Sequence, residues 1–274
     1  MAKILDVIKY LEKNASLRDI LRLHALMGDG KSKLELINYY YKLQLPSGAF
    51  PYRFQEESIP SLMHTYRAYH LLKEVSNTEE LANKCIEHLV QFLEVSQKEN
   101  GSWNEDERLL SIPDLPPWMN PKNKNVETLT TAYCGTIMII EKPSSIITQN
   151  AVNYLKKYRK YDGAFEGFLH TTWIAGVAFL GYYGTFNVTG REMISVIDDI
   201  LDQDHPGSVI QWIAASLLLF GFKPETLPLL SRALDILAKK QQPNGLWSSE
   251  DKGRDIQTTV DCLITLHMAD RIYF

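Results

Sequence analysis

The chain has 274 residues, of which 45% are hydrophobic and 23% are charged, and its formal net charge is −4. This composition is typical of a soluble globular protein with a large core. The slightly acidic balance and the lack of a long lysine or arginine run argue against nucleic acid as the main partner. No stretch of eighteen consecutive apolar residues is present, so the sequence predicts no transmembrane helix.

The N-terminal stretch MAKILDVIKYLEKN carries spaced charges and lacks the apolar core of a signal peptide. The three cysteines, Cys85, Cys134 and Cys262, form an odd and sparse set that is typical of free thiols in a reducing compartment. Together the two observations predict a cytoplasmic protein.

Apolar residues that recur every three to four positions predict twelve helices along the chain. The predicted helices cover residues 2–13, 16–27, 31–44, 59–74, 78–96, 125–141, 145–159, 169–183, 190–202, 208–220, 225–240 and 255–270. Half-exposed helices with one charged face, such as 78–96, precede helices that are apolar over most of their surface, such as 169–183.

Six such hairpins predict an all-α fold, an (α/α)6 toroid in which the apolar helices form the inner ring. We expect residues 1–274 to form a single domain whose last hairpin closes against the first. An open helical solenoid made of the same pairs is the alternative, although solenoids usually keep a more regular period.

A short motif, Gln-x3-Gly-x-aromatic, follows the half-exposed helices. Its copies lie at 44–50, 97–103, 159–165, 203–209 and 241–247, the third with Arg in place of Gln and the fourth with Val in place of the aromatic residue. A glycine suits a helix end that needs a left-handed residue. We therefore expect Gly101 and Gly245 to end helices. We expect Trp103 and Trp247 to be buried braces.

The motif, followed by the helix DIQTTVDCLITL at 255–266, resembles the QW repeat of squalene–hopene cyclases and its inner helix. The resemblance spans roughly residues 31–270. It implies the terpenoid cyclase and protein prenyltransferase superfamily, whose toroids hold isoprenoid chains in a central cavity. The function that it implies is an isoprenoid-processing enzyme that acts on a polyprenyl or squalene-like chain.

Aromatic side chains on the inner helices would line such a cavity, because their π-faces attract developing carbocations. The insertion at 104–125 and the equivalent loops of other repeats would supply contacts at its mouth. Helix N-termini there would suit an anionic head group such as diphosphate. The alternative is that the aromatic residues are ordinary core. The predicted substrate-binding residues are Tyr52, Arg53, Tyr66, Trp118, Tyr133, His170, Trp173 and Trp212.

A cyclase that starts by protonation needs an acidic carboxyl group facing the cavity. The Asp-x-Asp-Asp-Thr motif of class II cyclases is missing, and only Glu127 and Thr128 match it in the nearest segment. The catalytic candidates are Glu127, Asp255 and Asp261. The first and second are also typical carboxylates of helix N-termini. Asp261 lies on a mostly apolar helix, where a carboxyl group needs a partner or a function.

No metal site and no cofactor are expected. The zinc site of prenyltransferases uses an Asp and a Cys two residues apart, whereas Asp261 and Cys262 are adjacent and about 100° apart on a helix. His267 is also poorly placed to join them. The segment DDILD at 198–202 matches the magnesium motif of class I terpene synthases, but we place it on an outer helix as a solvated helix end.

Two other functions stay open. One is a non-catalytic toroid that binds a hydrophobic ligand or works with a partner subunit. The other is an (α/α)6 carbohydrate-active enzyme, which needs two carboxylates within about 10 Å of each other. The expected partner is a hydrophobic small molecule such as an isoprenoid. A protein partner subunit and a peripheral membrane contact are further options.

Overall fold

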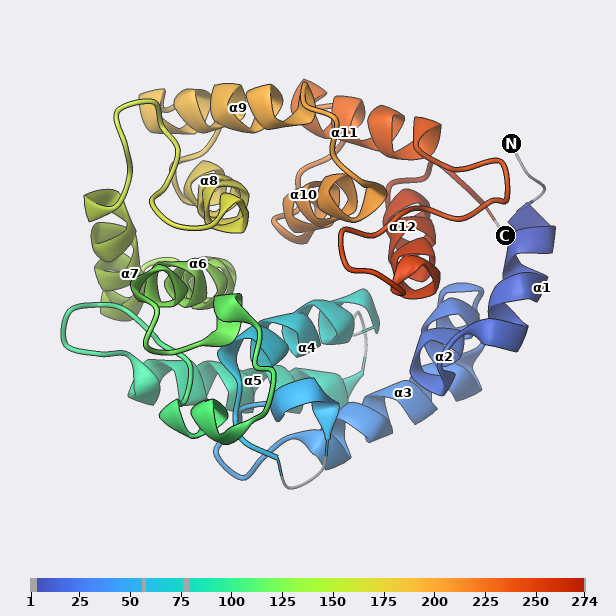
Figure 1. Ribbon diagram of the computed structural model, residues 1–274, viewed down its shortest axis with the longest axis horizontal. Coiled ribbons are helices and arrows are strands. Elements are labelled where there is room, and N and C mark those ends of the chain that lie inside the picture. Colours follow the sequence, from blue (N-terminus) through green and yellow to red (C-terminus); the bar gives the residue numbers. More distant parts are fainter. Residues whose placement is uncertain (1–3, 56–57, 76–78, 274) are drawn as a thin grey trace. The chain divides into compact units, whose positions relative to one another are not determined.

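The computed structural model describes residues 4–55, 58–75 and 79–273, which form twelve α-helices, three 3-10 helices and no β-strand (Figure 1). The α-helices are α1 (Ile4–Asn14), α2 (Leu17–Leu26), α3 (Gly30–Leu43), α4 (Leu62–Val75), α5 (Glu80–Ser96), α6 (Lys124–Glu141), α7 (Ile146–Lys157), α8 (Leu169–Tyr183), α9 (Val188–Leu201), α10 (Gly207–Leu219), α11 (Pro228–Lys239) and α12 (Asp255–Met268).

All twelve predicted helices are confirmed, each with ends within three residues of the predicted ones. The predicted starts at residues 2 and 78 lie outside the described residues. Within the described part of the chain, no helix combines the length and the hydropathy that a membrane span requires.

The chain divides into two compact units. Unit 1 comprises Met1–Leu36 and Asp198–Phe274, and unit 2 comprises Ile37–Ile197. Helices α3 and α9 cross from one unit to the other. The expectation of a single domain over residues 1–274 stays a prediction.

Unit 2 contains the two kinds of helix that the sequence predicts. Helix α6 is buried over most of its length and packs against α4 and α8, while α5 and α7 pack against this set (Figure 1). The sequence of α8, LHTTWIAGVAFLGYY, has no acidic residue, lysine or arginine, so every face of it can be buried. In contrast, α5 buries one face that includes Cys85, Leu89 and Leu93. Burial of each such leucine contributes about 1.5–3 kcal/mol.

In unit 1, the last helix packs against the first hairpin. Helix α12 contacts α1 and α2 as well as its neighbours α10 and α11. The predicted contact between the last and first hairpins is therefore confirmed within this unit.

In four of the five motif copies the glycine lies in a turn beyond the end of the amphipathic helix. Helix α5 ends at Ser96 and α11 ends at Lys239, so the prediction that Gly101 and Gly245 end helices is wrong. Gly48, Gly101, Gly163 and Gly245 have φ angles of 95°, 90°, 85° and 86°. A Cβ atom added to Gly101 would lie 2.5 Å from the Asn150 carbonyl oxygen of α7. Both the left-handed backbone and the close approach therefore require glycine.

The fourth copy in the chain, 203–209, is not a structural copy, and this prediction is wrong. Gly207 is the first residue of α10, and a Cβ atom added to it would lie 2.9 Å from the Cδ1 atom of Trp247. The glycine thus allows close packing against the brace of another copy and does not end a helix.

The aromatic residue of each of the four copies is tied to the apolar helix that follows it. In every case its backbone N–H donates to a threonine Oγ1 of that helix, which satisfies a buried donor. The pairs are Phe50–Thr65 at 2.9 Å, and Trp103–Thr131, Phe165–Thr172 and Trp247–Thr259 at 3.0 Å each.

The tryptophans are also tied to the preceding helix. Trp103 Nε1 donates to the Leu93 carbonyl at 3.0 Å, and Trp247 Nε1 donates to the Leu237 carbonyl at 2.7 Å. Both side chains are at most 2% exposed. The prediction that Trp103 and Trp247 are buried braces is confirmed.

The glutamine of the motif links one copy to the next amphipathic helix. Gln97 Nε2 donates to the carbonyl oxygens of Gly101 at 3.0 Å and Ile147 at 2.9 Å, the second of which lies in α7. Gln44 makes the corresponding contact with Cys85 of α5 at 2.8 Å. The motif therefore joins successive hairpins of unit 2, which explains why its residues recur.

Replacing Gly101 with alanine is expected to lower the free energy of unfolding by about 2 kcal/mol or more, because alanine disfavours φ of 90° and its Cβ would clash with Asn150. Chemical denaturation of the full chain measures the change. Gly30→Ala is the matched control, since nothing lies within 4 Å of an added Cβ there. Equal stability of the two variants would contradict the steric argument.

Candidate functional site

Four of the predicted substrate-binding residues lie on successive apolar helices of unit 2. The rings of Tyr66 on α4 and Tyr133 on α6 have centroids 4.5 Å apart. On α8, the rings of His170 and Trp173 have centroids 4.6 Å apart. Tyr66, Tyr133 and Trp173 are at most 5% exposed. We call these four residues, Tyr66, Tyr133, His170 and Trp173, the aromatic group.

The remaining aromatic candidates are dispersed. Trp212 is half-buried on α10 in unit 1. Tyr52 belongs to a 3-10 helix, Tyr52–Phe54, and is buried. Arg53 is exposed, and its guanidinium lies 5.2 Å from the centroid of the Tyr52 ring. Trp118, in the 3-10 helix Pro117–Met119, is 39% exposed.

The insertion 104–125 explains why Tyr52 is buried. The insertion supplies apolar side chains that cover Tyr52 and the start of α4. This small cluster consists of Tyr52, Leu109 and Met119, with Ile59, Met63, Ile112 and Leu115 packed against it. The insertion is therefore an ordered, packed segment, and Trp118 is its exposed aromatic residue.

The backbone beside this cluster is strained. Arg53 and Phe54 both have φ of 55°, in the left-handed region that non-glycine residues seldom adopt. Each such residue costs of order 1–3 kcal/mol and persists only where the surroundings hold it. Phe54 is held by packing against Tyr40 and His64.

Two of the three candidate acids lie at the starts of helices. Glu127, in the first turn of α6, accepts hydrogen bonds from Ser102 Oγ at 2.6 Å and Lys98 Nζ at 3.0 Å. Burial acts to raise the pKa of Glu127, but these two hydrogen bonds outweigh it and lower the pKa below its usual value. Asp255, the first residue of α12, accepts the backbone N–H of Ser249 at 2.8 Å.

The third candidate acid is in an ion pair. Arg22 Nη1 of α2 lies 2.6 Å from Asp261 Oδ1 of α12, and 3.4 Å from Asp19 Oδ1. The side chain of Arg22 is 2% exposed and that of Asp261 is 15% exposed. The carboxylate on the apolar helix thus has a partner, and it fixes α12 to α2.

No metal-binding cluster of three or more His, Cys, Asp or Glu residues occurs within the described ranges. Cys262 is fully buried, and this burial, with the adjacent Asp261, raises the pKa of its thiol well above its usual value. Asp198 and Asp202 lie at the end of α9, and both pair with Arg232 of α11. These carboxylates hold two amphipathic helices together.

Sequence reasoning missed a fourth carboxyl group, Glu105. It is 3% exposed and accepts hydrogen bonds from the backbone N–H groups of Leu62 at 2.8 Å and Met63 at 2.9 Å, and from Ser61 Oγ at 3.1 Å. It therefore caps the start of α4 and fixes the insertion to it. Burial raises the pKa of Glu105 to about 7, although the three hydrogen bonds oppose the rise.

The only signal in the sequence was the position of Glu105 two residues after the motif tryptophan. Gly167 is the corresponding residue of another copy, two positions after Phe165. It lies next to the start of α6, since a Cβ atom added to it would be 3.1 Å from the Cβ atom of Asn125. A charged residue in the polar run NEDER gives no indication of burial.

Glu105 is expected to make the protein less stable as the pH rises from about 4.5 to about 7. Its folded pKa of about 7 exceeds the ordinary value of 4.5, so the folded state keeps a proton that the unfolded state has lost. The fall in unfolding free energy is at most about 3 kcal/mol across this window. Urea denaturation at several pH values measures it.

The matched variants for this experiment are Glu105→Gln and Glu127→Gln. The first should flatten the dependence between pH 4.5 and 7, because it removes the group with the raised pKa. The second should not flatten it, because the pKa of Glu127 is lowered. An unchanged slope in Glu105→Gln would contradict the assignment.

The chain matches the family described as the prenyltransferase alpha-alpha toroid domain over residues 16–216. Among solved structures it is similar to a variant of the type II terpene cyclase MstE from Scytonema, in complex with the product merosterolic acid A. That similarity has a TM-score of 0.57 at 14% sequence identity, over 95% of this chain and 90% of the other.

No curated protein matches the chain. The family match covers more than half of the chain, and the solved structure shares its fold. The predicted terpenoid cyclase and prenyltransferase superfamily and the predicted α/α toroid are both confirmed. The chain belongs to the prenyltransferase alpha-alpha toroid domain family.

Proposed function

We propose that the protein is an isoprenoid-processing enzyme that acts on a polyprenyl or squalene-like chain. The observation that carries this proposal is the two ring contacts of the aromatic group, Tyr66–Tyr133 between α4 and α6 and His170–Trp173 within α8. Membership of the toroid family supports it. The similar cyclase MstE holds a hydrophobic product, which supports a hydrophobic ligand here.

The chemistry in this proposal is the stabilisation of positive charge on a hydrocarbon. The π-faces of Tyr66, Tyr133 and Trp173 attract a carbocation without offering a base that would quench it. Their burial excludes water, which would otherwise trap the cation. In the same proposal, the four structural copies of the motif are QW repeats that brace the helices carrying these rings.

Glu127, Asp255 and Asp261 remain the candidates for the proton donor. Each of them accepts a hydrogen bond in the structure. The pKa of Glu127 is lowered by its hydrogen bonds, which makes this carboxylate a poor proton donor. This observation favours a second candidate function, a non-catalytic toroid that binds a hydrophobic ligand or works with a partner subunit. A carbohydrate-active enzyme is not favoured by the family match.

The test is incubation of the full chain with farnesyl diphosphate, geranylgeranyl diphosphate and squalene, with products identified by gas chromatography and mass spectrometry. Turnover of one substrate is the expected result. Binding of a substrate without turnover, measured by native mass spectrometry, would replace the enzyme proposal with the non-catalytic one. If none of the substrates binds or reacts, both proposals fail.

Within this proposal, Trp173→Leu is expected to weaken binding of the hydrocarbon tail about tenfold, which corresponds to about 1.4 kcal/mol. The reason is the loss of an aromatic face, while leucine keeps an apolar side chain at the position. Titration of the protein with the bound substrate measures the dissociation constant. Phe186→Leu is the control, because Phe186 is 96% exposed and should leave affinity unchanged. Equal affinities of the two variants would remove Trp173 from the site.

A further inference from the structure

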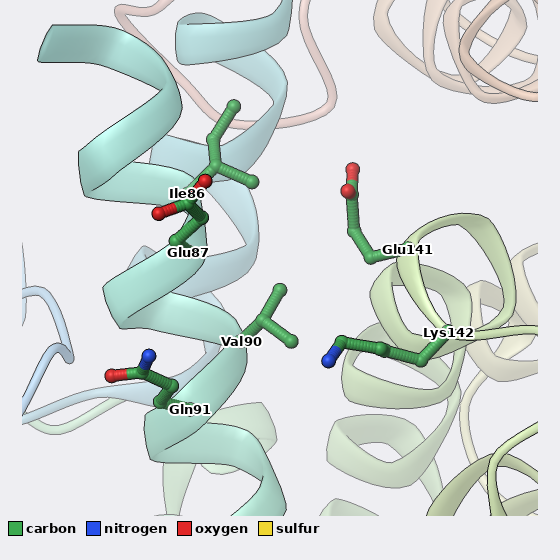
Figure 2. Close-up of a pocket in the computed structure, with 6 residues that line it drawn as sticks. All are labelled: Ile86, Glu87, Val90, Gln91, Glu141 and Lys142. Atoms are coloured by element: carbon green, nitrogen blue, oxygen red, sulfur yellow. The ribbon is translucent and has the colours of Figure 1, made fainter. Parts of the chain in front are cut away.

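A pocket in unit 2 lies between α5 and the end of α6, and none of the residues that line it belongs to the aromatic group (Figure 2). Its volume is about 390 Å³, within the range of about 300–1,000 Å³ that small-molecule sites occupy. Its walls are formed by Ile86, Glu87, Val90, Gln91, Glu141 and Lys142.

The pocket has an apolar wall and two polar ends of different character. Ile86 and Val90 are each 4% exposed and form the apolar wall on α5. Figure 2 shows Glu141 opposite Ile86 at one end and Lys142 opposite Val90 toward the other. Glu87 adds a second carboxylate on α5. One end thus carries the carboxylate of Glu141, whose Oε1 atom pairs with Lys73, and the other end carries the ammonium of Lys142.

Two side chains of α4 hold the carboxylate of Glu141 in place. Tyr69 donates its hydroxyl hydrogen to Glu141 Oε1 at 2.5 Å, and Lys73 Nζ lies 2.8 Å from the same oxygen. Burial, followed by the charge of Glu141, raises the pKa of Tyr69 far above its usual value, so the hydroxyl stays a donor. The acidic end is therefore preorganised.

The ammonium of Lys142 is less constrained. It lies 3.6 Å from the Glu94 carboxylate, which is longer than a hydrogen bond, and its side chain is 50% exposed. Such an exposed pair contributes little to stability. Lys142 can therefore turn from Glu94 to the anionic group of a ligand without a large loss.

We infer that this pocket binds a small apolar zwitterion, namely a free amino acid or dipeptide with aliphatic side chains. Its ammonium group lies toward Glu141 and Glu87, its carboxylate toward Lys142, and its side chain against Ile86 and Val90. This assignment is independent of the isoprenoid proposal, because the residues that line the pocket are not those of the aromatic group.

Other occupants fit the charges less well. An anion without an ammonium group would meet the carboxylates of Glu87 and Glu141, and a simple cation would leave Lys142 without a partner on the ligand. A purely apolar molecule would remove water from these charged groups and give no polar contact in return. The zwitterion matches both ends of the pocket.

The test is isothermal titration of the full chain, without any isoprenoid, using leucine and leucyl-leucine as probes. The expected result is binding by at least one probe, with at least tenfold loss when its amine is acetylated or its carboxylate is converted to an amide. Lys142→Gln should weaken binding of the uncapped probe by the same factor. It should not weaken binding of the amide any further, because the amide has no carboxylate for Lys142 to contact. Lys84→Gln is the control, since Lys84 is exposed on α5 and pairs with Glu80.

Three results would overturn the inference. One is the absence of binding by both probes at millimolar concentration. Another is equal affinity for the uncapped and capped probes, which would mean that the charged groups of the probe do not contribute to binding. The third is an unchanged affinity in Lys142→Gln. None of them affects the isoprenoid proposal, because the titration measures neither turnover nor binding of a polyprenyl chain.

Discussion

Replacing Trp103 with alanine is expected to lower the free energy of unfolding by about 3–5 kcal/mol. The side chain is fully buried and its indole N–H donates to the Leu93 carbonyl at 3.0 Å. Alanine would leave a cavity, and the Leu93 carbonyl would lose its shorter hydrogen bond and keep the 3.5 Å contact with Ser96 Oγ. The loss is a large part of the 5–15 kcal/mol that stabilises a typical domain, so the variant should be partly unfolded at 37 °C.

Equilibrium denaturation in urea, followed by far-ultraviolet circular dichroism, measures this change. Trp118→Ala is the matched control, because Trp118 is 39% exposed and is expected to change stability by less than about 1 kcal/mol. Trp103→Phe should recover part of the loss by filling the cavity without restoring the hydrogen bond. Similar stabilities for Trp103→Ala and Trp118→Ala would contradict the bracing role.

Patterns within a few turns of the chain were enough to predict the helices. The apolar sequence of α8 and the one-sided burial of α5 both follow from residue spacing. The positive φ angles of Gly101 and Gly245 also fit the motif, although the two glycines lie in turns beyond the ends of α5 and α11. Gly207 shows the limit of this reasoning. Its spacing matches the motif, but the close approach of Trp247, 40 residues further along the chain, decides its role.

The site was harder to predict because its residues depend on distant partners. Tyr52 was expected at an open mouth, yet apolar side chains of the insertion, including Leu109 and Met119, cover it. Glu105 appeared to be one more residue of a solvated run, and only its contacts with the start of α4 make it a buried cap. Burial of this kind cannot be deduced from local periodicity.

Asp261 illustrates the same limit and has consequences for any test of the proposed chemistry. Its partner Arg22 is 239 residues away in sequence. Asp261→Asn is expected to destabilise the protein by about 1–3 kcal/mol, because the buried Arg22 guanidinium loses its shortest contact with a carboxylate and keeps the longer one with Asp19 at 3.4 Å. The side chain of Arg22 is 2% exposed, so water cannot compensate. Thermal and urea denaturation of the full chain measure the loss.

A loss of activity in Asp261→Asn therefore cannot by itself identify Asp261 as the proton donor. The double variant Arg22→Met/Asp261→Leu removes both charges, and replacement of a buried pair by apolar residues is often neutral or stabilising. Asp19 keeps its contacts with Ser16 and Arg18 in this variant. We expect the double variant to be more stable than Asp261→Asn; the reverse order would contradict the ion-pair argument.

Activity of the double variant then separates the two roles of Asp261. If a substrate is found that the natural protein turns over, retained turnover in a stable Arg22→Met/Asp261→Leu protein would exclude Asp261 as the acid and leave Glu127 and Asp255. Loss of turnover with native stability and unchanged ligand affinity would favour Asp261, because folding and binding would be intact. The comparison depends on the pair being replaced together, since the single substitution changes charge balance, stability and chemistry at the same time.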